Sequence, residues 1–219
     1  MNLNVTTILL ISLGFTGMIN PALANDATIP LNGNNHGTPA CVSCHGAHGE
    51  GMPENGFPRL AGLNAGYIQS QLNALANGQR INVMMTPIAK TLNPDEQASV
   101  ARYYAGLGRT VTISEPVAEI NSAGARLAVQ GRWSQGLPAC IQCHGVMGAG
   151  VGSIFPALAG QSSMYIENQL RAWQQGTRAP GPLGLMKVIA SKLSATDIHE
   201  VAIYFSALPP GAVFQRNKP

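Results

Sequence analysis

The sequence is poor in charged residues, in aromatic residues and in cysteine. Charged residues make up 11% and aromatic residues 5% of the 219 residues, and there are four cysteines. No basic run is dense enough to suggest a nucleic-acid partner, so we expect none. Two short stretches contain all four cysteines, which leaves none for a separate structural disulfide. A fold with two cores would be short of aromatic side chains and would need another large apolar body.

The two cysteine-containing stretches share the form C-x-x-C-H, which is the signature of covalent attachment of c-type haem. The two thiols reach the two vinyl groups of one haem, and the histidine that follows is placed under the iron as its axial ligand. The motif residues are Cys41, Cys44 and His45 in the first stretch, and Cys140, Cys143 and His144 in the second. The sequence thus predicts two haem c groups, which would supply the missing apolar bodies.

Two other kinds of site contain C-x-x-C pairs. One pair can be a redox dithiol, and two pairs can form a four-cysteine zinc site. Neither kind of site requires a histidine directly after the second cysteine. Here a histidine follows both times, which favours haem attachment.

Residues 1–24 resemble a secretory signal peptide. An apolar run extends from Ile8 to Ile19, and Ala22-Leu23-Ala24 forms a small-x-small cleavage pattern before Asn25. The segment before the run lacks Lys and Arg, which is atypical, but the run is too short to span a bilayer comfortably. We therefore expect an exported, periplasmic protein, a location that suits c-type haem because this haem is attached outside the bacterial cytoplasm.

The second half of the chain repeats the first. Residues 57–62 read Phe-Pro-Arg-Leu-Ala-Gly, and residues 155–160 read Phe-Pro-Ala-Leu-Ala-Gly, 98 positions later. Each copy continues with an amphipathic helical pattern and ends in a second helix, which begins at a capping residue, Asn93 or Ser194. The repeat predicts a mainly α-helical protein with a first domain at 25–110, a linker at 111–118, and a second domain with its tail at 119–219.

The repeat also selects two methionines as sixth ligands of the iron. Met85 and Met186 lie 40 and 42 residues after their histidines, and each precedes a helix-capping residue by eight positions. Met84 is the competitor of Met85, but its counterpart is Leu185. A methionine ligand closes the iron site and raises its reduction potential, which suits electron transfer, whereas an open position permits catalysis.

Two arginines and three further histidines remain to be interpreted. Arg80 and Arg178 occupy equivalent positions after the first long helix of each copy. They either pair with the carboxylates of the haem propionates or are ordinary solvated arginines. His36, His48 and His199 are interpreted as ordinary surface or loop histidines.

On these motifs, the chain resembles the di-haem cytochromes of the cytochrome c4 type, which contain two class I cytochrome c domains in tandem, each wrapped around one covalently bound haem. The resemblance covers nearly all of the chain after residue 24. It implies that the carbonyl groups of Pro58 and Pro156 accept hydrogen bonds from the two haem histidines. It also implies that the haems lie near the domain interface and exchange electrons. Residues 25–39 depart from the family, since they show no helical period where an N-terminal helix normally packs on the last helix.

The resemblance implies an electron carrier of a periplasmic respiratory chain rather than an enzyme. Its expected partners are a respiratory donor complex or a dehydrogenase on one side and a terminal oxidase on the other. Peripheral association with the periplasmic face of the inner membrane is compatible with such partners. One alternative is the cytochrome subunit of a sulfide or thiosulfate dehydrogenase. A second alternative, a di-haem peroxidase, would need an open iron position, and the two matched methionines disfavour it.

Overall fold

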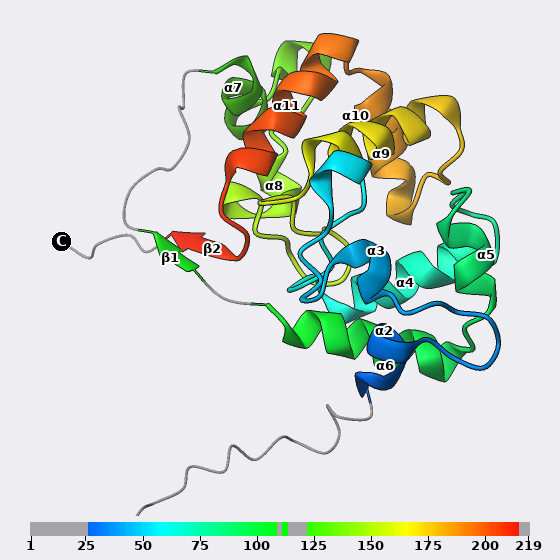
Figure 1. The fold of residues 1–219 in the computed structure, drawn as a ribbon. Coiled ribbons are helices and arrows are strands. Elements are labelled where there is room, and N and C mark those ends of the chain that lie inside the picture. The colour runs from blue at the N-terminus through cyan, green and yellow to red at the C-terminus, as the bar shows by residue number, and fades with distance from the viewer. Residues whose placement is uncertain (1–25, 109–110, 114–121, 215–219) are drawn as a thin grey trace, which may run out of the picture.

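The computed structural model describes residues 26–108, 111–113 and 122–214, so the expected signal peptide and most of the expected linker lie outside the described residues. The described chain is mainly helical, as predicted. Its helices form two groups, one from each half of the sequence (Figure 1). None of the described helices combines the length and the apolar character needed to cross a membrane.

The first domain places its two long helices against each other. Its elements are α2 (Thr28–Asn32), α3 (Val42–His45), the 3₁₀ helix η1 (Pro53–Asn55), α4 (Ala65–Ala76), α5 (Met85–Lys90) and α6 (Pro94–Gly106). Ile68 and Leu72 of α4 pack with Val100 and Tyr104 of α6 in one buried cluster. Cys41 of the first C-x-x-C-H motif packs against this cluster.

The last helix of each domain begins at the predicted cap. The Asn93 side chain accepts hydrogen bonds from the backbone of Asp95 and Glu96, and the Glu96 carboxylate accepts one from the Asn93 backbone. Ser194 and Asp197 form the same reciprocal arrangement at the start of α11 (Ala195–Ala207). Such capping boxes satisfy two backbone donors that a helix start otherwise leaves unpaired. The local sequence therefore determines where these helices begin.

Residues 25–39, which show no helical period in the sequence, contain a short N-terminal helix. The five-residue helix α2 forms there and packs on α6. Just before it, the Asp26 carboxylate accepts hydrogen bonds from Ser99 Oγ (2.8 Å) and from Arg102 Nε and Nη2 (2.9 and 2.7 Å). Pro30 of α2 is fully buried. The helix is too short to produce a helical period, and contacts with α6 stabilise it instead.

The second domain repeats this arrangement and adds a longer N-terminal helix. Its elements are α7 (Ala123–Gln130), η2 (Trp133–Gln135), α8 (Ile141–His144), η3 (Val146–Gly148), α9 (Ser163–Gln175), η4 (Pro182–Gly184), α10 (Leu185–Ser191) and α11 (Ala195–Ala207). The side chain of Ser122 caps α7 at its start. Helix α7 crosses α11 so closely that a Cβ atom on Gly124 would collide with the Glu200 carbonyl oxygen.

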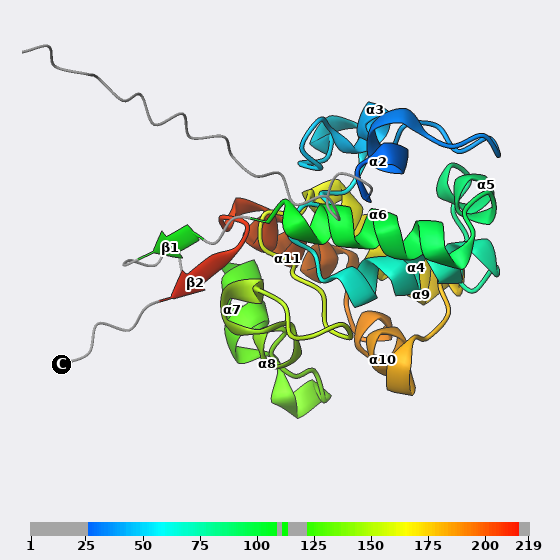
Figure 2. The ribbon, with the colours of Figure 1, turned by 90° about the horizontal axis from the view of Figure 1, so that it is seen from below.

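One feature of the fold was not predicted. Strand β1 (Val111–Ile113), inside the expected linker, pairs in parallel with β2 (Ala212–Phe214) in the C-terminal tail. The pair lies to one side of the helical body in both views (Figures 1 and 2). Each strand has three residues, which is too short for an alternating pattern to stand out from a loop. The described part of the linker is therefore tied to the tail.

Candidate haem sites and the interface between them

One cavity of about 480 Å³ is lined by residues of both domains. Both C-x-x-C-H motifs reach its walls, with all four cysteines and both histidines among the lining residues. Met85 and Met186 line it as well, from α5 and α10. The structure therefore brings the predicted attachment residues and the predicted axial ligands of both domains to one shared space.

Each attachment motif forms a single helical turn. The backbone N–H of His45 donates to the Cys41 carbonyl, and that of His144 donates to the Cys140 carbonyl, both at 2.9 Å. Residues three and four positions apart lie on the same face of such a turn. The two thiols and the imidazole of each motif consequently point toward the same side, as attachment to one planar group requires. Gly46 and Gly145 end both turns with positive φ angles.

Both motif histidines are buried and are oriented by a proline carbonyl. His45 Nδ1 lies 2.9 Å from the Pro58 oxygen, and His144 Nδ1 lies 2.8 Å from the Pro156 oxygen. The Nδ1–H group donates to this carbonyl, so the lone pair is left on Nε2. Burial lowers the pKa of both imidazoles, although the carbonyl acceptors partly oppose this shift. A neutral imidazole with a fixed tautomer and ring orientation is suited to bind iron.

The cysteines do not match the alternative sites. Burial raises the pKa of the Cys41 and Cys140 thiols to about 11, whereas a reactive redox dithiol needs a lowered pKa. All four cysteines are free. No three His, Cys, Asp or Glu side chains within the described ranges converge as a metal site, so the two motifs do not combine into one zinc centre. The thiols are arranged for two separate attachments.

The exposure of the methionines separates the two candidates in the first domain. Met85 is half-buried and packs on the core cluster of the first domain, and Met186 does the same in the second domain. Met84 also lines the cavity, but its side chain is 56% exposed. A ligand held by packing is better placed to stay on an iron atom than an exposed one. The axial role of Met85 and Met186 stays a prediction.

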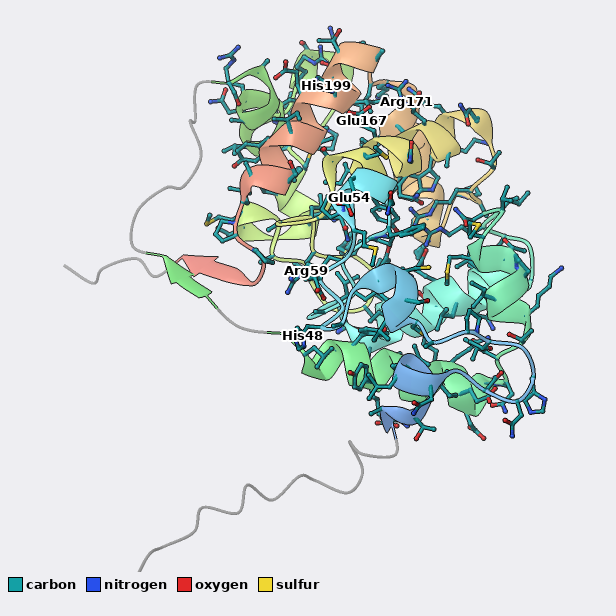
Figure 3. The ribbon with its side chains drawn as sticks, in the orientation of Figure 1. His48, Glu54, Arg59, Glu167, Arg171 and His199 are labelled. Atoms are coloured by element: carbon teal, nitrogen blue, oxygen red, sulfur yellow. The ribbon has the colours of Figure 1, made fainter. Side chains whose placement is uncertain are left out.

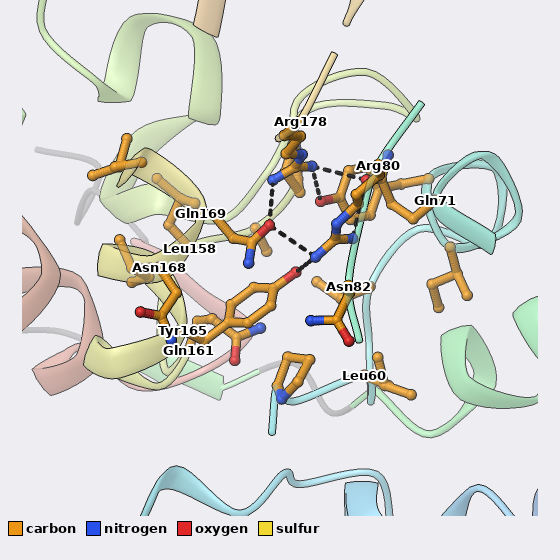
Figure 4. Close-up of a pocket in the computed structure, with 18 of the residues that line it drawn as sticks. Leu60, Gln71, Arg80, Asn82, Leu158, Gln161, Tyr165, Asn168, Gln169 and Arg178 are labelled. Carbon is orange, nitrogen blue, oxygen red and sulfur yellow. Dashed lines mark hydrogen bonds between the residues drawn. The ribbon is translucent and has the colours of Figure 1, made fainter. Parts of the chain in front are cut away.

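Arg80 and Arg178 meet at the domain boundary (Figure 4), where their backbones pair in an isolated antiparallel bridge. Each guanidinium binds side chains of both domains. Arg80 donates to Gln71 of its own domain (3.2 Å) and to Tyr165 and Gln169 of the other (both 2.8 Å). Arg178 repeats the pattern with Gln169 (3.0 Å), Gln71 (2.8 Å) and Tyr67 (3.4 Å). Arg178 is only 8% exposed, so the interpretation as a solvated arginine is wrong for it.

These two cations lack a carboxylate partner among the residues that the structure describes. Arg178 instead lies over the Trp173 ring, with its Cζ atom 3.9 Å from the ring centre. Burial raises the pKa of Tyr165, but Arg80 and Arg178 lower it by more. Two neighbouring cations, one half-buried and one buried, are unfavourable without anions nearby. Each haem carries two propionate carboxylates, so the walls of this cavity fit haem in charge as well as in apolar character.

The other histidines lie on the surface, as expected. His36 and His48 are exposed. His199 of α11 lies 2.9 Å from the Glu167 carboxylate of α9, which also binds Arg171 at 3.3 Å (Figure 3). The sequence did not reveal the roles of Gln71, Gln169, Tyr67 and Tyr165 at the domain boundary. The signal that could have identified them is their equivalence in the repeat, close to the equivalent arginines.

Comparisons with known proteins agree with this site. The sequence profile of the family described as Cytochrome c matches residues 31–107. The thiosulfate dehydrogenase electron acceptor of Thiomonas intermedia is 43% identical over 173 residues, which is 78% of this chain and 79% of the relative. Cytochrome c4 of Pseudomonas aeruginosa is 33% identical over 91% of this chain and 96% of its own.

Solved structures give the same result. A thiosulfate dehydrogenase from Marichromatium purpuratum superposes with a TM-score of 0.78 and 37% identity over 85% of this chain, which spans only 40% of the length of that chain. Cytochrome c4 from Pseudomonas stutzeri superposes with a TM-score of 0.70 and 28% identity, over 85% of this chain and 98% of its own. The protein described here therefore belongs to the cytochrome c family, as an electron carrier of the c4 type that binds haem c covalently.

Proposed function

We propose that this cytochrome carries two haem c groups, one in each domain, and accepts electrons in the periplasm from a thiosulfate-oxidising dehydrogenase. The observation that carries the choice of donor is the pattern of sequence identity. Two relatives named thiosulfate dehydrogenase electron acceptor are 43% and 44% identical to this chain, whereas four named cytochrome c4 are 31–34% identical. This favours the dehydrogenase-linked alternative over a general respiratory donor.

The proposed sites use equivalent residues of the two domains. Cys41 and Cys44 attach the first haem, with His45 and Met85 as axial ligands and Pro58 orienting the histidine. Cys140, Cys143, His144, Met186 and Pro156 take the same roles in the second domain. When bound, each haem supplies an iron that accepts and releases one electron. The chain holds each imidazole neutral and fixed, surrounds the site with apolar side chains, and places Arg80 and Arg178 where they balance the propionate charge.

The position of the arginines supports electron exchange between the domains. Each guanidinium binds residues of both domains, so residues of both domains would help to balance the charge of propionates at this boundary. A buried, hydrogen-bonded boundary holds two redox groups at a constant separation. Such a boundary would let the two domains exchange electrons without a movement of the domains.

The downstream part of the proposal follows the same logic. The apolar segment and cleavage pattern within residues 1–24 support export to the periplasm. There a terminal oxidase or another acceptor would oxidise the reduced protein. Association with the periplasmic face of the inner membrane would then occur through that partner.

Two measurements test this proposal. The protein is produced with its own first 24 residues in a bacterium that attaches haem c, and its intact mass is determined. We expect a chain beginning near Asn25 with two covalent haems, and a mass with one haem or none would contradict the site assignment. The oxidised protein is then mixed with thiosulfate, with and without a purified thiosulfate dehydrogenase. Reduction only in the presence of the dehydrogenase supports the proposed donor, and absence of reduction in both mixtures overturns it.

A further inference from the structure

The hydroxyl group of Tyr104 is buried and lacks a hydrogen-bond partner among the described residues. Tyr104 lies in α6, is fully buried, and lines the shared cavity. A buried hydroxyl without a partner is unfavourable, and such groups in native proteins normally have an explanation. The orphaned hydroxyl therefore points to a partner that belongs to the haem-loaded protein.

Cys41, the first cysteine of the first attachment motif, packs against the buried cluster that contains Tyr104, and both residues line the cavity. Burial, and after it the Cys41 thiol, raise the pKa of Tyr104. The ring is held firmly in place. A Cβ atom on Gly49 would lie 2.7 Å from the Tyr104 ring, and the Tyr103 ring packs edge-on at 5.1 Å between ring centres. The position of the hydroxyl beside Cys41 is thus determined by packing.

The second domain provides an internal comparison, because the equivalent residue is Phe205. Phe205 is 1% exposed, lines the same cavity, and packs edge-on against Tyr204, also at 5.1 Å. A Cβ atom on Gly148 would lie 2.8 Å from the Phe205 ring, just as a Cβ atom on Gly49 would lie close to the Tyr104 ring. The two aromatic rings therefore occupy matching places. The hydroxyl group is the chemical difference between them.

Attachment of haem turns Cys41 into a thioether, whose sulfur bears no hydrogen and only accepts hydrogen bonds. The Tyr104 hydroxyl can then donate to it, which directs the positive end of the O–H dipole toward the first haem. A positive potential favours the reduced iron, and its effect is large where water is excluded. Hydrogen bonds near a haem are one of the means by which a protein sets its reduction potential.

We propose that Tyr104 raises the reduction potential of the first haem through a hydrogen bond to the Cys41 thioether. Phe205 has no hydroxyl group, so the second haem receives no such hydrogen bond. This inference rests on the proposed presence of two haems. The exchange it influences moves one electron from the ferrous second haem to the ferric first haem, leaving a ferric second and a ferrous first haem. Tyr104 shifts this equilibrium toward the reduced first haem.

The test is a redox titration, followed by optical spectroscopy, of the haem-loaded protein and of Tyr104→Phe. We expect one of the two one-electron potentials to fall, by about 30–60 mV, which corresponds to a threefold to tenfold change in the equilibrium constant. Tyr103→Phe is the matched control, because it removes a hydroxyl from the same helix at a position that does not line the cavity. Its two potentials should equal those of the parent protein.

Phe205→Tyr supplies a second, independent variant. It should raise the potential that Tyr104→Phe leaves unchanged. Both variants are first checked for two covalent haems and for the thermal stability of the parent, so that a folding defect is recognised. If Tyr104→Phe retains two haems and both parental potentials, the inference is overturned. If the parent protein itself carries fewer than two haems, the proposed function fails, and this inference fails with it.

Discussion

Gln161 of the second domain is hydrogen-bonded twice to the main chain of Arg59 in the first domain. Its Oε1 atom accepts from the Arg59 N–H at 2.9 Å, and its Nε2 atom donates to the Arg59 carbonyl at 3.0 Å. Arg59 directly follows Pro58, whose carbonyl orients His45. The second domain therefore stabilises, through hydrogen bonds, the segment whose carbonyl group orients His45. Leu63, the equivalent residue of the first domain, has no side-chain amide with which to make the reverse contact.

Replacement of Gln161 by leucine should destabilise the protein. The change removes both hydrogen bonds and leaves main-chain groups of Arg59 without these partners, at a cost of about 1–3 kcal/mol in the free energy of unfolding. Denaturant unfolding of the haem-loaded protein measures this difference. Gln130→Leu, at the exposed end of α7, is the control and should change the free energy by less than about 0.5 kcal/mol. Equal stabilities of the two variants would show that the Gln161 contact contributes nothing.

Removal of an axial methionine should open one haem to carbon monoxide. The dithionite-reduced parent protein should not bind the gas at neutral pH, because the proposed ligand set gives both irons six ligands. Met85→Ala and Met186→Ala should each bind it at one of the two haems, and Met84→Ala should behave as the parent does. Optical spectra during a titration with the gas give the bound fraction. Binding by Met84→Ala but not by Met85→Ala would move the ligand assignment to Met84.

Replacement of Arg178 should affect both stability and redox behaviour. Arg178→Gln removes hydrogen bonds to Gln71 and Tyr67 across the boundary, which should cost about 1–3 kcal/mol. It also removes a buried positive charge, so the haem reduction potentials should fall. Arg178→Lys keeps the positive charge but loses the planar guanidinium group. It should therefore lower the stability, with a smaller change in reduction potential than Arg178→Gln causes. Unfolding and redox titrations separate the two effects, and equal potentials in all three proteins would argue against propionate pairing.

The Asp26 carboxylate should make the stability of the first domain depend on acid pH. Its hydrogen bond from Arg102 is the main cause of a pKa below the ordinary value of 3.8. A carboxylate with a lowered pKa in the folded state contributes stability above its unfolded pKa, and this contribution is lost as the pH falls through the folded pKa. Asp26→Asn should therefore melt at a lower temperature than the parent at neutral pH, and the gap should close below about pH 4.

Thermal unfolding between pH 2 and pH 7 measures this gap. Glu54→Gln removes an exposed carboxylate from η1 and is the matched control. It should follow the parent over the whole range. A gap for Asp26→Asn that stays constant with pH would show that charge does not cause the effect.

Short-range patterns predicted much of the fold. The capping residues of α6 and α11 satisfy backbone groups within their own first turn, so their effect is visible in the sequence. The repeat marked the two domains and the equivalent methionines. Helix α2 escaped prediction because Asp26, which holds the chain beside it, binds residues more than 70 positions away. The pairing of β1 with β2 escaped because its two short strands lie about 100 residues apart.

The sequence by itself determined the chemistry of each candidate haem site. Cys41, Cys44 and His45 share one face of one helical turn wherever the turn is placed, and the second motif does the same. Only the tertiary structure decided how the two sites face each other. Three features arise only when surfaces distant in sequence pack together. They are the hydrogen bonds of Arg80 and Arg178 to both domains, the hydrogen bonds between Gln161 and Arg59, and the buried hydroxyl group of Tyr104. Their geometry depends on the docking of whole helices and domains, which local spacing does not encode.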